Sequence, residues 1–377
     1  MQTCALPFPE CFIPKIRTRG NGLKVLIRAD ANKTVSMGHV MRCLSIADAL
    51  KSLGASVLFV CAKSDAKELI NKRGFDVSVL DTDFDKTIDE LGKFSALIKQ
   101  ENPNLIICDG YYFSSLYFEE IGKYAETVYL DDYSKDAYPV DVLINYNIYG
   151  DLTDYEGIYK RANVKLPRLI LGTDYAPLRK EFIDAKPIDI KQNAPFNVLV
   201  STGGSDSLHI AKTVADRFLE SPKEGIKLNI LVGPFSSDYD FLCKLEKTHH
   251  DVLKIWSDIT DMPGFLANFD YAISAAGSTT YELCRMGIPS VIFSMADNQD
   301  LINETFDSKK IIKSAGNAQK HFDETISNLL HCIYTIEECY EQRVMYSDAQ
   351  KKCVDGKGAL RIANFLIKGE GKDEKNN

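Results

Sequence analysis

Residues 24–50 read KVLIRADANKTVSMGHVMRCLSIADAL, and this stretch decides the fold. A short apolar run at 24–27 is long enough for a buried strand and too short for a helix. Residues 30–36 are polar and suit a loop. Apolar residues then recur at helical spacing, at Val40, Cys43, Leu44, Ala47 and Leu50. The stretch therefore predicts a strand, a loop and a helix in that order.

Gly38 and His39 stand where this helix is expected to begin. A glycine allows a ligand to approach the backbone closely. The free amides and the positive dipole end of a helix N-terminus favour an anion. His39 can take or give a proton near neutral pH at such a place. A hydrogen-bonded histidine at a helix cap is the alternative interpretation of the same residue.

The composition limits the classes of function. A chain of 377 residues, 45% of them apolar, favours two domains with ordinary cores. The formal net charge of -8 argues against nucleic acid as the main partner. No apolar run approaches the length of about 18 residues that a membrane span needs. Residues 1–22 contain three prolines and no continuous apolar core, so we expect an irregular extension rather than a secretory signal.

The ten cysteines indicate the redox environment. None forms a Cys-x-x-Cys pair, and several lie inside apolar runs, as Cys61 and Cys108 do. Buried reduced thiols explain this pattern better than disulfides or zinc ligands. We therefore expect a cytoplasmic protein.

Short apolar strands alternate with helical segments through the first half of the chain. Strands are predicted at 56–61, 76–80, 104–108, 126–130, 140–144 and 168–171. This alternation is typical of a parallel sheet with helices on both faces, and such sheets bind ligands beyond the carboxyl ends of their strands. Polar clusters follow three of the strands, at 30–39, 109–112 and 131–133. The three clusters predict a cleft at that edge.

The second half repeats the alternation. Strands are predicted at 197–200, 227–232, 252–255, 270–274 and 290–293. The rest reads as helices, the last near 359–367. The linker is placed at 186–195, which contains two prolines. The predicted domains are 23–185, with His39, and 196–368, which binds the nucleotide; residues 369–377 are expected to be a disordered tail.

Two Gly-Ser loops in the second half each lie between a strand and a helix. They are Gly203-Gly204-Ser205 and Gly277-Ser278-Thr279. Their amides and hydroxyls suit a diphosphate, although each is also an ordinary turn sequence. Neither ends in Gly-Lys-Ser/Thr, which argues against a kinase or an ATPase.

Glu282 lies one helical turn beyond Ser278, on the same face. A carboxylate there can accept hydrogen bonds from both hydroxyls of a ribose, or it can be a solvated helix residue. None of the six histidines has the spacing of zinc ligands, so no metal is expected.

Residues 36–44, SMGHVMRCL, closely resemble the signature of the UDP-2,4-diacetamido-2,4,6-trideoxy-β-L-altropyranose hydrolase family of pseudaminic acid biosynthesis. Further blocks resemble that family in the same order. They lie at 109–111, 172–182, 203–206, 276–283, 297–299 and 355–362. The resemblance implies an α/β protein of the glycosyltransferase-B fold. In that fold two Rossmann-like parallel-sheet domains face each other across a cleft, and the second holds most of the nucleotide.

The resemblance also implies roles for residues. His39 would be the general base that activates water, and Glu282 would hold the ribose. The two Gly-Ser loops would bind the nucleotide. The side chains expected on the sugar and phosphate side are Tyr111, Asn298, Gln299 and Arg28.

The predicted function is therefore a metal-independent, inverting hydrolase without a cofactor. It would cleave UDP-2,4-diacetamido-2,4,6-trideoxy-β-L-altrose to UDP and the free sugar, in nonulosonic acid biosynthesis. One alternative is a glycosyltransferase of the same fold, in which an acceptor hydroxyl replaces water. The other is a nucleotide-sugar binding protein, which would bind its ligand without turnover.

Overall fold

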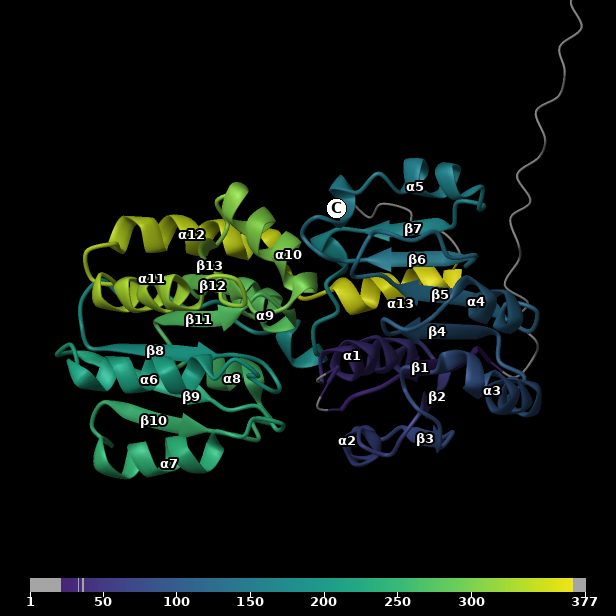
Figure 1. Ribbon diagram of the computed structural model, residues 1–377. Helices are drawn as coiled ribbons and strands as arrows, with labels where there is room; N and C mark the ends of the chain where they lie inside the picture. Colours follow the sequence, from purple (N-terminus) through teal and green to yellow (C-terminus); the bar gives the residue numbers. More distant parts are fainter. Residues whose placement is uncertain (1–21, 33, 36, 369–377) are drawn as a thin grey trace, which may run out of the picture.

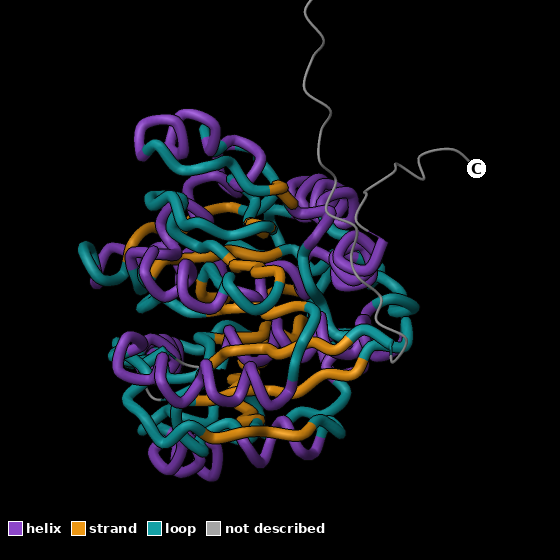
Figure 2. The backbone as a smooth tube through the Cα atoms, turned by 90° about the vertical axis from the view of Figure 1, so that its right-hand side faces the viewer, coloured by secondary structure: helices purple, strands orange, loops and turns teal. Residues whose placement is uncertain are grey.

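The computed structural model describes residues 22–32, 34–35 and 37–368. The extension predicted at the start of the chain, apart from Gly22, and the tail predicted at 369–377 lie outside the described residues. The chain forms two parallel sheets, each with its own helices, side by side (Figure 1). The view turned by 90° shows the strands as an inner layer with helices around them (Figure 2). These features confirm the predicted α/β class.

The first sheet has seven parallel strands in the order β3-β2-β1-β4-β5-β6-β7. The strands are β1 (Lys24–Ala29), β2 (Ser56–Cys61), β3 (Asp76–Val79), β4 (Leu105–Asp109), β5 (Glu126–Leu130), β6 (Val142–Asn145) and β7 (Arg168–Leu171). The strand predicted at the start of the chain is β1, and it lies inside the sheet between β2 and β4.

The helices of the first half are α1 (Gly38–Ser52), α2 (Lys67–Lys72), α3 (Thr87–Glu101), α4 (Ser115–Ile121) and α5 (Tyr155–Ala162), with 3₁₀ turns at Gly150–Leu152, Thr173–Tyr175 and Lys180–Phe182. Side chains alternate along β1 and so serve two layers. Val25 and Ile27 pack in the same cluster as Val40 and other residues of α1. Leu26 points to the other face, in the cluster that contains residues of α3 and α4.

The second sheet has six parallel strands in the order β10-β9-β8-β11-β12-β13. The strands are β8 (Phe196–Ser201), β9 (Ile226–Leu231), β10 (Leu253–Trp256), β11 (Tyr271–Ala275), β12 (Ser290–Ser294) and β13 (Lys313–Asn317). The helices are α6 (Ile210–Glu220), α7 (Tyr239–Thr248), α8 (Met262–Leu266), α9 (Ser278–Met286), α10 (Asp297–Ser308), α11 (Phe322–Tyr334), α12 (Tyr340–Cys353) and α13 (Gly358–Lys368).

β13 corrects the sequence analysis, which predicts only helices after residue 293. Its sequence, KSAGN, lacks the apolar run on which the other strands were recognised, and only Ala315 is buried. The strand forms because β12 offers it a partner along the edge of the sheet. Pairing, rather than intrinsic preference, therefore decides this element.

α13 corrects the predicted domain boundary at residue 368. Its apolar side chains recur at helical spacing and pack in the core of the first sheet, together with α1. They are Ala359, Ile362, Ala363 and Leu366. Figure 1 shows this helix within the half of the molecule that contains α1 and β4. An amphipathic pattern predicts a helix but does not identify the sheet that the helix covers.

Five of the eight described cysteines are buried, as their apolar surroundings predict: Cys43, Cys61, Cys108, Cys284 and Cys332. Burial raises the pKa of the Cys61 thiol to about 12, which keeps it protonated and unreactive. In the described part of the chain, no helix combines the length and the apolar character that a membrane crossing requires.

The position of α13 leads to a stability prediction. Ile362 is fully buried between α13 and the first sheet. Ile362→Ala is expected to lower the free energy of unfolding by about 2–5 kcal/mol, because it removes packed methylene groups and leaves a cavity. Urea denaturation measures this change.

Met345→Ala is the matched control, because Met345 lies exposed on α12. It is expected to change the free energy of unfolding by less than about 0.5 kcal/mol. Hydrogen exchange should show that Ile362→Ala loosens α1 rather than α6. Loosening confined to α6 would contradict the packing of α13 on the first sheet.

Candidate active site

The polar clusters predicted after β1, β4 and β5 meet at one edge of the first sheet. Ala29 at the end of β1 is in register with Asp109 at the end of β4. Asp109 is in register with Leu130 of β5, so Asp131 and Asp132 follow directly beside it. Parallel strands in register end at the same edge, which gathers these carboxylates.

A buried arginine holds two of the carboxylates together. Arg42, on α1, donates from Nε to Asp109 Oδ2 at 2.6 Å and from Nη1 to Asp132 Oδ1 at 2.8 Å. Its Nη2 donates to Asp132 Oδ2 at 2.7 Å, and Nη1 also donates to the Tyr146 hydroxyl at 3.0 Å. Burial favours the protonated form of Asp109, but the charge of Arg42 and the hydrogen bonds from Arg42 and His39 outweigh it and hold the pKa of Asp109 well below its usual range.

His39 joins this network through one ring nitrogen. Its Nδ1 lies 2.6 Å from Asp109 Oδ1 and 3.0 Å from Arg42 Nη2. Arginine can only donate, so Nδ1 cannot accept from Arg42 while it donates to Asp109. The shorter contact and the negative charge of Asp109 favour a proton on Nδ1. This assigned tautomer leaves a lone pair on Nε2, with which His39 can act as a base.

A contact from the second half of the chain completes the group around His39. The ring of Tyr111 lies edge-on to the His39 ring, with centroids 4.6 Å apart. The Tyr111 hydroxyl donates to Asp132 Oδ2 at 3.3 Å and accepts from Asn298 Nδ2 at 2.8 Å. Asn298 belongs to α10, so two of the residues predicted on the sugar side meet next to His39. The carboxyl edges of the two sheets therefore face each other here.

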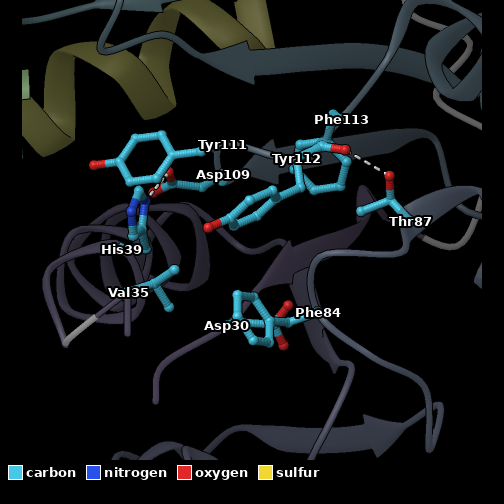
Figure 3. Close-up of a pocket in the computed structure, with 10 residues that line it drawn as sticks. Asp30, Val35, His39, Phe84, Thr87, Asp109, Tyr111, Tyr112 and Phe113 are labelled. Atoms are coloured by element: carbon cyan, nitrogen blue, oxygen red, sulfur yellow. Dashed lines mark hydrogen bonds and ion pairs between the residues drawn. The ribbon is translucent and has the colours of Figure 1, made fainter. Parts of the chain in front are cut away.

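A cavity of about 20 Å³ lies beside His39, which is room for about one water molecule. His39 and Asp109 line one end, and Phe84 and Tyr112 lie farther along it (Figure 3). The lining residues are Asp30, Val35, His39, Phe84, Thr87, Asp109, Gly110, Tyr111, Tyr112 and Phe113. The cavity can hold a small nucleophile next to the base.

Arg28 does not reach this cavity, and the contact with substrate predicted for it is corrected here. It lies on the face of β1 opposite to α1 and is 1% exposed. Its Nε and Nη2 donate to the two carboxylate oxygens of Glu90, both at 2.8 Å, and Nη1 donates to Asp30. The period-2 alternation of a strand sends Arg28 into the core beside α3, where it fixes Asp30 instead of meeting a ligand.

Gln299, the remaining residue predicted on the sugar side, lies next to Asn298 on α10. Its Oε1 accepts from the backbone N–H of Met295 at 2.9 Å. The carbonyl oxygen of the Gln299 side chain therefore holds the loop before α10. Its Nε2 group still has two N–H donors of its own.

The two Gly-Ser loops differ in a way that the sequence does not reveal. α9 begins after Gly277 without a side-chain cap and without an acidic residue in its first turn. A Cβ atom added at Gly277 would meet nothing within 4 Å, so the space before this helix end is open. The amides of Ser278 and Thr279 find no partner within the described ranges, so they can receive an anion.

The end of α6 is already occupied by a carboxylate. Asp206 accepts from the amides of Ile210 and Ala211, both at 2.9 Å. Gly203 and Gly204 pack closely on Gly233. A Cβ atom added at Gly233 would lie 2.2 Å from the backbone oxygen of Gly203. Of the two predicted diphosphate loops, the geometry thus favours Gly277-Ser278-Thr279, and Gly203-Gly204-Ser205 retains its own backbone groups and the Ser205 hydroxyl for a ligand.

Glu282 follows on the inner face of α9 and is 8% exposed. Arg179 donates from Nε and Nη2 to Glu282 Oε1, at 3.1 and 2.7 Å. Tyr281, beside it, donates to Asn147 Oδ1 at 3.1 Å, and its ring lies against Tyr146. Through Tyr146, α9 is connected to Arg42 and hence to the His39 network.

No sequence motif gives a role of their own to Arg42, Asp132, Tyr146 or Arg179. The spacing of His39 and Arg42, three residues apart on one helix face, is a signal for Arg42. Tyr146 and Arg179 lie in irregular segments, and no sequence pattern connects them with the site. Within the described ranges no three His, Cys, Asp or Glu side chains are grouped so that they could hold a metal ion.

No family model matches the chain. It is 26% identical to an uncharacterized protein of Methanocaldococcus jannaschii, over 79% of this chain and 61% of that protein. The match therefore spans less than two thirds of the archaeal relative. The spore coat polysaccharide biosynthesis protein SpsG of Bacillus subtilis is 24% identical, over 91% of this chain and 98% of its own length.

A third relative is the UDP-2,4-diacetamido-2,4,6-trideoxy-β-L-altropyranose hydrolase of Campylobacter jejuni. It is 24% identical over 69% of this chain and 87% of its own length. The predicted resemblance is confirmed.

Solved structures show the same architecture. MurG of Acinetobacter baumannii has a TM-score of 0.61 at 16% identity and covers 92% of this chain and 100% of its own. The spinosyn rhamnosyltransferase SpnG has a TM-score of 0.56 at 13% identity, over 93% of this chain and 100% of its own. This protein has the glycosyltransferase-B fold. At these identities the likeness shows the fold alone.

The charge network leads to a prediction on pH. The pKa of Asp109 is lower in the folded protein than the value of about 3.9 expected in the unfolded chain. Its contribution to stability is therefore complete above about pH 4 and is lost as the pH falls further. Asp109→Asn is expected to destabilise the protein at pH 7 by about 3 kcal/mol, since it leaves Arg42 with one carboxylate fewer.

The difference between Asp109→Asn and the native protein should shrink as the pH is lowered from 4 toward 2, as measured by urea denaturation at each pH. Asp85→Asn is the control, because Asp85 is exposed on a loop; it should stay within about 0.5 kcal/mol of the native protein. An Asp109→Asn penalty that is constant from pH 7 to pH 2 would contradict the network as described.

Proposed function

We propose that this protein hydrolyses UDP-2,4-diacetamido-2,4,6-trideoxy-β-L-altrose to UDP and the free sugar, in the cytoplasm and within pseudaminic acid biosynthesis. The observation that carries the proposal is the His39–Asp109 pair, which lines a cavity with room for about one water. The relative from Campylobacter jejuni supports the class of substrate, because its name states this hydrolysis. SpsG supports the link with polysaccharide biosynthesis.

The reaction uses one base and one leaving group. His39 Nε2 takes a proton from water, and the oxygen attacks the anomeric carbon on the side opposite to UDP. The bond from that carbon to the bridging oxygen breaks, and its electron pair stays with the diphosphate. Attack from the side opposite to the leaving group inverts the configuration at the carbon. Asp109 holds the imidazole in the required tautomer and stabilises the imidazolium that forms.

The second half of the chain binds the nucleotide in this proposal. The open N-terminus of α9, at Gly277, Ser278 and Thr279, receives the diphosphate, and its dipole stabilises the charge that develops on the leaving group. Glu282 holds the ribose. Tyr111, Asn298 and Gln299 contact the sugar side.

Two alternatives use the same fold. A glycosyltransferase would bind an acceptor hydroxyl where the hydrolase binds water, and the solved neighbours include glycosyltransferases. The cavity beside His39 can hold the water that the hydrolase needs. A nucleotide-sugar binding protein would need no base. UDP release from a panel of UDP-sugars, with and without acceptors, separates the three functions.

The position of His39 predicts which bond breaks. In water enriched in ¹⁸O, attack at carbon puts the heavy oxygen on the sugar, and attack at phosphorus puts it on UDP. We expect the label on the sugar, as read by mass spectrometry. His39→Asn should bind UDP nearly as well as the native protein and lose about 10²–10⁴-fold in rate, the usual contribution of a positioned acid–base group.

His250→Asn is the control, because His250 also lies beside an aspartate, Asp251, but both are exposed. Its rate should stay close to that of the native protein. Label on UDP, or near-native turnover by His39→Asn, would rule out this mechanism.

The open helix end of α9 predicts metal independence, since helix amides can stabilise the diphosphate in place of a cation. Activity should be unchanged after dialysis against a strong chelator, as measured by UDP release. Loss of activity that magnesium or manganese restores would overturn this part of the proposal.

A further inference from the structure

Two arginines fasten the segment 179–185 to α9. Arg179 reaches Glu282 from this segment, as described above. Arg285, one turn farther along α9, donates to the carbonyl oxygens of Phe182, Ile183 and Ala185 at 2.9, 3.0 and 2.5 Å. One arginine therefore fixes the backbone of the segment, and the other fixes a carboxylate on the helix.

The contact with Glu282 is one-sided. Both N–H groups of Arg179 donate to Oε1, and among the described residues no hydrogen bond engages Oε2. The two side chains are only 14% and 11% exposed. A carboxylate oxygen accepts hydrogen bonds, so Oε2 remains available to a hydroxyl group that a ligand brings.

The fold does not decide which nucleotide sugar is bound. A solved neighbour, the rhamnosyltransferase SpnG, is complexed with thymidine diphosphate, and another, MnaA of Staphylococcus aureus, is solved with UDP. Thymidine diphosphate contains a deoxyribose, and UDP contains a ribose. Discrimination between the two must therefore come from individual side chains rather than from the architecture.

We propose that Arg179 is a positioning residue that aims the free oxygen of Glu282 at the ribose, so that the site selects ribonucleotides over 2′-deoxyribonucleotides. The inference rests on the proposed function, in which the end of α9 holds a nucleoside diphosphate. A guanidinium fixes the direction of a carboxylate through two N–H groups in one plane. A lysine ammonium supplies the charge without that fixed geometry.

Calorimetry with UDP and 2′-deoxy-UDP tests the inference. The native protein is expected to bind UDP about tenfold or more tightly than 2′-deoxy-UDP, the effect of one hydrogen bond to a charged group. Glu282→Gln should reduce this preference to about threefold or less, because a neutral amide accepts more weakly. Arg179→Lys should reduce it to a similar level, mainly through weaker binding of UDP.

Arg285→Lys is the matched control. It disturbs the other clamp on the same segment and leaves the contact between Arg179 and Glu282 in place. Its preference for UDP should equal that of the native protein. An equal loss in Arg285→Lys would mean that Arg179 acts only by anchoring the segment, and would overturn the inference.

The remaining outcomes are also decisive. An unchanged preference in Arg179→Lys, or equal weakening of both ligands, would overturn the positioning role. Equal binding of UDP and 2′-deoxy-UDP by the native protein would overturn this inference alone, whereas no binding of UDP would overturn the proposed function itself. If Arg179→Lys does not fold, as judged by circular dichroism, Arg179→Met replaces it with the same expectation.

Discussion

The structure of the site depends on the burial of Arg42 between Asp109 and Asp132. A buried charge without a partner costs several kcal/mol, on the order of 3–5 when one member of a pair is removed. The guanidinium and the two carboxylates therefore hold one another, and with them α1 and the ends of β4 and β5. His39 is fixed because it shares Asp109 with Arg42. A base in a defined tautomer is thus a consequence of charge neutralisation in the core.

The same network connects the two halves of the molecule. Asp132 accepts from Tyr111, whose hydroxyl accepts from Asn298 of α10. Arg42 also reaches Tyr146, whose ring lies against Tyr281 of α9. Packed side chains therefore link α9, whose open end suits a diphosphate, with His39, which suits the role of a base. This arrangement fits a ligand that contacts both sheets at their carboxyl edges.

Helix ends that look alike in sequence differ in what they can bind. Both α6 and α9 follow a strand and a Gly-Ser loop. Asp206 occupies the amides of α6, whereas Gly277 leaves those of α9 free. The end of α9 therefore retains the partial positive charge that attracts an anion. Arg179 then sets the direction of the one carboxylate that lies nearby on that helix.

The sequence by itself determined the elements whose signal is local. Apolar runs predicted the strands of both sheets other than β13, and helical spacing with Gly38 and His39 predicted the start of α1. Strand ends predicted that the aspartates after β4 and β5 would gather near His39. Motifs in order predicted the fold and the similarity to the hydrolase of Campylobacter jejuni. These features depend on period, length and chain order, which a single sequence records.

Only the tertiary structure decided the features that depend on partners distant in the chain. β13 exists because β12 pairs with it, and α13 covers the first sheet although it follows the second. The face of β1 on which Arg28 lies decided that it pairs with Glu90 rather than with a ligand. Arg179 fixes Glu282 from a segment more than a hundred residues away. Each depends on the free energy of a contact between distant residues, which a local pattern of residues does not contain.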